Sequence, residues 1–101
     1  MKLNQKQLKI IGNYFSGKPV NKAFLFGSQV RDEAKESSDI DILVELDYSQ
    51  RIGLLFVQMQ IDLENLLGKK VDLVSEKGIS RYIKPIVDKE KQLIYARQTW
   101  R

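Results

Sequence analysis

Hydrophobic and polar positions follow two different periods along the chain, and each change of period marks a predicted element. Apolar residues three or four positions apart predict amphipathic helices, whereas alternation or a short apolar run predicts strands. We therefore expect helices over residues 3–15, 28–34, 49–67 and 79–91, and strands over residues 22–26, 39–46, 69–75 and 92–96. Pro85 is expected to disturb the last helix, because proline has no amide N–H to donate.

This alternation of strands and helices predicts a mixed α/β (α+β) fold in which helices cover a small sheet. With 101 residues, the chain is expected to form a single domain over residues 1–101. The strand over residues 39–46 should bury one face only. Ile40, Ile42 and Val44 would form that face, with Asp39, Asp41 and Leu43 on the other.

The helix over residues 49–67 has two apolar lines. The main stripe comprises Ile52, Leu55, Phe56, Met59, Leu63 and Leu66. A second line comprises Leu54, Val57 and Ile61. We favour a helix buried on two sides, and the alternative is a surface for another protein chain.

Composition narrows the possible chemistry. The chain has no histidine and no cysteine, which excludes disulfides, thiolate catalysis and Cys/His zinc sites. Any metal must then be a hard cation held by oxygen atoms. The formal net charge of +4 suits a polyanionic partner without selecting one, and we expect no sequence-specific binding of nucleic acid. No leader-like or membrane-spanning run is evident, so we expect a cytoplasmic protein.

The first candidate for a binding site is the Gly27-Ser28 pair after the strand over residues 22–26. Glycine permits a tight turn and a close approach of the backbone to a ligand. Ser28 is a suitable N-cap for the following helix, and a helix N-terminus favours phosphate. Arg31 lies on the same side of this segment, where it contacts a phosphate or pairs with an acidic residue between positions 32 and 36.

The second candidate is a set of aspartates. Asp39 and Asp41 are two residues apart on a predicted strand, so their side chains leave the same face. Two such carboxylates repel each other unless a cation lies between them, and magnesium is suited to that position. Asp72 lies on the next predicted strand and reaches the same cluster if the two strands pair. It would bind a second metal ion or accept a proton from an attacking hydroxyl.

These residues together resemble the minimal nucleotidyltransferases of the DNA polymerase β-like superfamily. The signature is Gly-Ser, ten residues, then Asp-x-Asp, and here it reads Gly27-Ser28, ten residues, then Asp39-Ile40-Asp41, with Asp72 at the third acidic position. The resemblance implies that Gly27 and Ser28, with Arg31 beside them, bind the triphosphate of ATP. It also implies that Asp39, Asp41 and Asp72 hold one or two Mg²⁺ ions and carry the catalysis.

Small members of this family are commonly antitoxins. The resemblance implies a HEPN-domain ribonuclease toxin as partner, and transfer of AMP from ATP to a tyrosine of that toxin. Two alternatives stay open: inhibition by docking without catalysis, or transfer to a small hydroxylated acceptor. The tail containing Tyr95, Arg97, Trp100 and Arg101 either frays or anchors a partner. No residue pattern indicates which nucleotide base is preferred.

Overall fold

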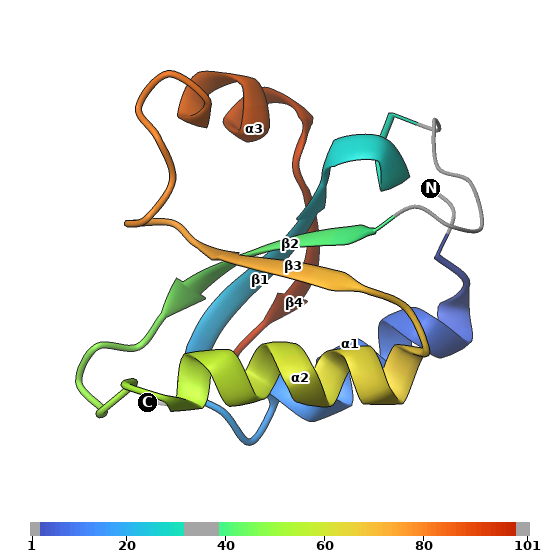
Figure 1. The fold of residues 1–101 in the computed structure, drawn as a ribbon, viewed down its shortest axis with the longest axis vertical. Coiled ribbons are helices and arrows are strands. Elements are labelled where there is room, and N and C mark those ends of the chain that lie inside the picture. The colour runs from blue at the N-terminus through green and yellow to red at the C-terminus, as the bar shows by residue number, and fades with distance from the viewer. Residues whose placement is uncertain (1–2, 32–38, 99–101) are drawn as a thin grey trace.

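The computed structural model describes residues 3–31 and 39–98. Its centre is a four-stranded sheet with the order β3-β2-β1-β4. The helices α1 and α2 lie along one face of this sheet, and the short helix α3 lies over the other (Figure 1). The expected mixed α/β fold, with helices covering a small sheet, is therefore confirmed.

Both strand orientations occur in the sheet. β1 (Val20–Phe26) is antiparallel to β2 (Ile40–Leu46) and to β4 (Gln92–Ala96), while β2 is parallel to β3 (Val71–Ser75). The parallel pair needs a long crossover, and α2 provides it. Three of the four strands differ from the expected bounds by one or two residues, and β4 matches them.

The helix α1 (Gln5–Phe15) begins two residues later than expected, because Asn4 is its N-cap. The Asn4 side chain accepts a hydrogen bond from the Gln7 amide at 2.8 Å, and the Gln7 side chain accepts one from the Asn4 amide at 3.0 Å. This reciprocal pair satisfies two amide groups that a helix end otherwise leaves without partners. Ile11 and Phe15 then face the sheet and are fully buried.

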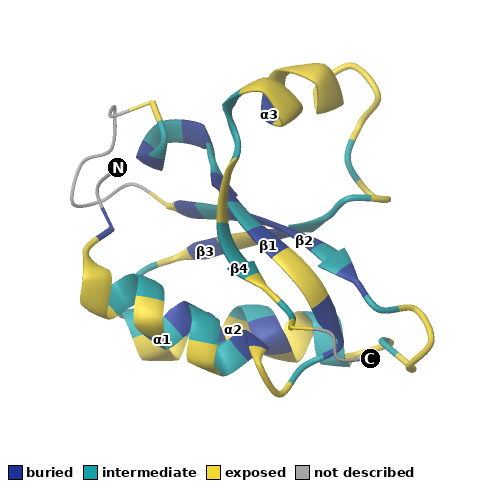
Figure 2. Ribbon diagram, turned by 180° about the vertical axis from the view of Figure 1, so that it is seen from behind, coloured by how far each residue is buried: buried dark blue, intermediate teal, exposed yellow. Residues whose placement is uncertain are grey.

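The core lies between the sheet and these helices, where Figure 2 shows buried residues along β1 and β2. Its largest fully buried apolar side chains are Phe15, Ile11, Leu25, Ile40, Ile42, Met59, Leu63, Val20 and Val44. On the opposite face of β2, Leu43 is only 3% exposed, so the expectation of one buried face is wrong for this strand. The α3 segment covers that second face.

The helix α2 (Leu55–Leu67) is shorter than expected at its start. The Asp47 carboxylate accepts hydrogen bonds from the Ser49 amide and hydroxyl, which forms a turn instead of a helical start. Gly68, with φ of +66°, ends α2 in the left-handed conformation.

The second apolar line of α2 is exposed. Leu54, Val57 and Ile61 are 86%, 54% and 44% exposed, so the favoured interpretation of a helix buried on two sides is wrong. In the main stripe, Leu66 is also half exposed, and its neighbour Leu67 packs on the core instead.

The helix α3 (Lys84–Glu90) is seven residues long, much shorter than the expected helix over residues 79–91. Pro85 lies in its first turn, where no intrahelical amide bond is lost, so the proline marks the start of this helix and does not disturb it. No helix in the described ranges is long and apolar enough to cross a membrane.

Candidate nucleotide site

The Gly27-Ser28 turn lies at the end of β1, where the chain enters a single turn of 3₁₀-helix, η1 (Gly27–Gln29). Gly27 has a φ of +75°, a left-handed conformation that favours glycine. A side chain at this position would also clash, because an added Cβ would lie 3.1 Å from Cγ of Asp41 and closer still to its Oδ2. The Gly27 backbone therefore packs directly against one of the predicted metal-binding carboxylates.

The expected helix over residues 28–34 is not formed in the part of this segment that the structure describes. The residue before η1 is Phe26, and no side chain caps the turn, so Ser28 is not an N-cap. The remaining residues of the expected helix, 32–34, lie outside the described ranges. A single 3₁₀ turn has little macrodipole, so any phosphate binding here depends on backbone amides and the Ser28 hydroxyl.

The three aspartates come from two adjacent strands. Asp39 precedes β2 and is exposed, Asp41 is half-buried within β2, and Asp72 is exposed on β3. Asp41 and Asp72 are directly paired in the parallel register of β2 and β3. Paired residues on neighbouring strands project from the same face of a sheet, so the strand pairing brings these two carboxylates together.

The electrostatics of Asp41 reflect this crowding. Burial, followed by the negative charges of Asp72 and Asp39, raises the pKa of Asp41 from 3.8 to about 6. The Arg31 guanidinium lowers this pKa and the Glu90 carboxylate raises it. Asp41 thus carries its negative charge at a cost, and a bound cation would remove that cost.

The donor set fits a hard cation such as Mg²⁺, since all three candidate ligands are carboxylates with mutually repelling charges. Within residues 3–31 and 39–98, however, no three Asp, Glu, His or Cys side chains are already close enough to enclose an ion. Magnesium usually takes one or two carboxylates and completes its coordination with waters and substrate phosphates, so it does not require a finished cage.

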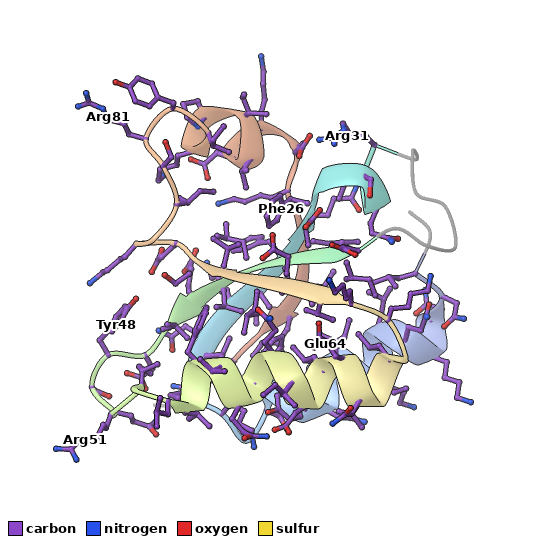
Figure 3. All side chains as sticks on the ribbon, in the orientation of Figure 1. Phe26, Arg31, Tyr48, Arg51, Glu64 and Arg81 are labelled. Atoms are coloured by element: carbon purple, nitrogen blue, oxygen red, sulfur yellow. The ribbon has the colours of Figure 1, made fainter. Side chains whose placement is uncertain are left out.

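Arg31 follows η1 by two residues, and its side chain lies on the side of the sheet where α3 lies (Figure 3). Its Nη1 donates to both carboxylate oxygens of Glu90, at 3.0 and 3.1 Å. The same Glu90 accepts a hydrogen bond from the Gly27 amide at 3.0 Å. The acidic partners first considered for Arg31, Asp32, Glu33 and Glu36, lie outside the described residues.

Two residues that lie near this turn are not singled out by any sequence pattern. Glu90 is one, because it is distant in the chain and belongs to no motif. The other is Gln29, which is fully buried although, among residues 3–31 and 39–98, neither polar atom of its side-chain amide finds a hydrogen-bond partner. A polar residue inside a short turn gives no sequence signal of burial, since such positions usually face solvent.

Comparison with known proteins identifies the family. Residues 5–94 match the model of the nucleotidyltransferase domain. The curated relatives include the protein adenylyltransferase MntA of Thermococcus cleftensis, which is 42% identical over 71 residues, covering 70% of this chain and 71% of that protein.

Solved structures agree with this assignment. A chain assigned to the minimal nucleotidyltransferases is 30% identical, with a TM-score of 0.75, covering 87% of this chain and 89% of that one. A toxin–antitoxin crystal structure with AMP-PNP has a TM-score of 0.73 at 22% identity, covering 95% of this chain and 76% of that one, and this likeness shows the shared fold. The chain therefore belongs to the nucleotidyltransferase-domain family in its minimal form, and is a nucleotidyltransferase.

Proposed function

We propose that this chain is a magnesium-dependent protein adenylyltransferase that transfers AMP from ATP to a tyrosine hydroxyl of a HEPN ribonuclease toxin, and so acts as its antitoxin. The observation that carries the proposal is the in-register pair of Asp41 and Asp72 beside the Gly27 turn. The reaction consumes ATP, and the proposal therefore locates it in the cytoplasm.

In this proposal, the turn binds the triphosphate. Gly27 has no side chain, so its backbone packs directly against the Asp41 carboxylate. Ser28 offers its hydroxyl and amide as hydrogen-bond donors, and Arg31 supplies a positive charge that acts on Asp41. Donors of this kind hold phosphate oxygens at fixed positions, which is the main requirement of phosphoryl transfer.

Asp39, Asp41 and Asp72 would hold the metal. When bound, Mg²⁺ neutralises charge on the phosphates and on these carboxylates. The tyrosine oxygen forms a bond to the α-phosphorus, the bond between that phosphorus and the bridging oxygen to the β-phosphate breaks, and pyrophosphate leaves. The hydroxyl proton goes to a carboxylate, and Asp72 is suited to accept it because it is exposed on the same face as Asp41.

The partner and the acceptor are inferred from relatives. MntA of Thermococcus cleftensis, similar over most of this chain, is named a protein adenylyltransferase. A more distant structural neighbour is a tri-AMPylated HEPN toxin of Shewanella oneidensis in complex with its MNT antitoxin. These two names support a protein acceptor and a HEPN partner over a small-molecule acceptor.

The test uses the purified chain, α-labelled ATP, Mg²⁺ and the protein encoded by the neighbouring gene. We expect label on the partner protein, and none with Asp39→Ala, which removes an exposed carboxylate without opening the core. Asp88→Ala is the matched control, because Asp88 is an acid on α3 that pairs with Lys84 and Lys91. Asp88→Ala should label the partner as wild type does. No label with the wild-type chain, or equal labelling with Asp39→Ala, would contradict the proposal.

A second candidate is inhibition by binding alone, and the exposed line of Leu54, Val57 and Ile61 on α2 favours it. An apolar line of this size on a helix is suited to a protein interface. Under this alternative, Asp41→Ala still forms the complex and still protects cells from the toxin. Under the adenylyltransferase proposal, the same variant binds the toxin but no longer protects.

A further inference from the structure

The carboxylate of Glu90 connects two parts of the candidate site. It accepts hydrogen bonds from the Gly27 amide at 3.0 Å and from Nη1 of Arg31 at 3.0 Å. Its side chain is only 17% exposed, whereas that of Arg31 is 46% exposed. The carboxylate is therefore the more firmly held partner, and it restrains the arginine side chain.

The position of Glu90 follows from the register of the sheet. β1 and β4 pair through Phe24 with Leu93 and through Leu25 with Gln92, and this antiparallel register would place residue 90 opposite Gly27. Glu90, however, is the last residue of α3 and is not part of a strand. The β1–β4 ladder would otherwise continue at this point with a backbone carbonyl. Instead, the Glu90 side chain accepts the hydrogen bond from the Gly27 amide.

We propose that Glu90 is a positioning residue for the nucleotide: it fixes the backbone of the Gly27-Ser28 turn and the direction of Arg31 at the same time. This inference rests on the proposed function, because it takes this turn and Arg31 as the binding site for the triphosphate. Glu90 acts through these two groups and does not contact the substrate.

Electrostatics alone would suggest that Glu90 weakens nucleotide binding, but the geometry argues against this. A carboxylate near a triphosphate repels it, and Glu90 does raise the pKa of Asp41. Yet Glu90 faces Gly27 from the β4 side, whereas Asp41 pairs with β1 from the β2 side. The partly buried hydrogen bond from the Gly27 amide is lost without Glu90, and an amide left without an acceptor favours rearrangement of the turn.

The experiment measures binding of Mg-ATP to the full chain by calorimetry, with circular dichroism to verify folding. We expect Glu90→Ala to weaken binding about tenfold, the factor that corresponds to losing one partly buried hydrogen bond with a charged partner. Glu90→Gln keeps an acceptor oxygen for the Gly27 amide and should restore part of the affinity. Asp88→Ala, which removes an acid from the same helix without contact to Gly27 or Arg31, should bind as wild type.

A double-mutant cycle separates positioning from a general loss of stability. If Glu90 acts partly through Arg31, Glu90→Ala combined with Arg31→Ala weakens binding by less than the product of the two single effects. In the labelling assay, Glu90→Ala should raise KM for ATP with a smaller change in kcat. If Glu90→Ala does not fold, Glu90→Gln takes its place in the cycle and tests the same coupling to Arg31.

The outcomes distinguish this inference from the function on which it rests. If wild type binds Mg-ATP and the Glu90 variants bind it equally well or more tightly, Glu90 has no positioning role. The adenylyltransferase proposal then remains intact. If the double variant weakens binding by the full product of the two single effects, Glu90 does not act through Arg31. Wild type that does not bind Mg-ATP overturns both.

Discussion

At the scale of single residues, the candidate site depends on a glycine and an aspartate that occupy adjoining space. Gly27 provides a left-handed turn, and the carboxylate of Asp41 fills the volume that a side chain at position 27 would need. Gly27 directly follows β1, whose last residue, Phe26, pairs with Asp41 on the neighbouring strand β2. A change at either residue therefore affects the other.

Gly27→Ala should destabilise the fold and weaken binding of Mg-ATP. The left-handed conformation alone costs roughly 1–3 kcal/mol with a side chain, and the new Cβ also displaces the Asp41 carboxylate. Urea denaturation and calorimetry measure the two effects. Gly12→Ala is the control, because Gly12 lies within α1 with nothing within 4 Å of an added Cβ, and it should be neutral or stabilising. Wild-type affinity in Gly27→Ala would contradict the assignment of the turn.

Asp41→Asn should stabilise the metal-free protein at neutral pH. The pKa of Asp41 rises from 3.8 to about 6 on folding, so the folded state binds the proton more tightly than the unfolded state. Wild type then loses stability as pH rises from about 4 to about 6, and the variant lacks this loss. Denaturation with a chelator present should find the two proteins similar at pH 4 and the variant more stable at pH 7. Identical pH profiles would show that burial and the neighbouring carboxylates do not raise the pKa of Asp41.

At the scale of elements, α2 has two different sides. Met59 and Leu63 are fully buried against the sheet, whereas Leu54, Val57 and Ile61 are exposed. The helix is thus held to the fold by one stripe, and its outer line contributes little to that attachment. A protein keeps such a line either for binding or because nothing selects against it.

Substitution on the two sides of α2 should therefore have very different effects. Val57→Gln and Ile61→Gln should each change the free energy of unfolding by no more than about 0.5 kcal/mol, as is usual for surface positions. Leu63→Ala, on the buried side, should lose roughly 2–5 kcal/mol. Chemical denaturation gives all three values. A large loss in Val57→Gln would mean that the outer line packs against another part of the chain.

Most elements could be predicted from the sequence because their apolar spacing is a local signal. The errors have two sources. The start of α2 depends on a local side-chain turn, in which Asp47 accepts hydrogen bonds from Ser49 and competes with helix formation. Burial of Leu43 depends on a distant contact, because α3, from a later part of the chain, lies over that face of the sheet. Asp41 and Asp72 could be placed in one site because each lies on a recognisable strand. Glu90 could not, because its role follows from the β1–β4 register.

At the scale of the whole molecule, Arg97 connects three separate parts of the chain. Its guanidinium donates to the Asp47 carboxylate at 2.9 Å, to the Lys18 carbonyl at 2.8 Å and to the Asn21 side chain at 3.2 Å. The expectation that the tail frays or anchors a partner is therefore wrong for Arg97, which binds within the protein. Trp100 and Arg101 lie outside the described residues.

This contact predicts a pH dependence at the acidic end. Hydrogen bonds from Ser49 and then from Arg97 hold the pKa of Asp47 well below its ordinary value of 3.8. The contribution of Asp47 to stability is thus present above pH 3.8 and is lost as pH falls below that value. Asp47→Asn should be less stable than wild type at pH 7, and the difference should shrink steadily as pH falls below 3.8. Denaturation at several pH values measures this. A difference that persists in strong acid would assign the effect to packing instead of charge.

The parallel alignment of β2 with β3 has a consequence for how distant homologues are found. Because a whole helix separates these strands, insertions in that connection leave the spatial match of the two acids untouched while altering the number of residues between them. A fixed-spacing signature will detect the Gly-Ser and Asp-x-Asp positions across divergent genomes yet overlook the third acid. Searches for remote members should anchor that acid to the strand that follows the helix, whatever its distance along the polypeptide.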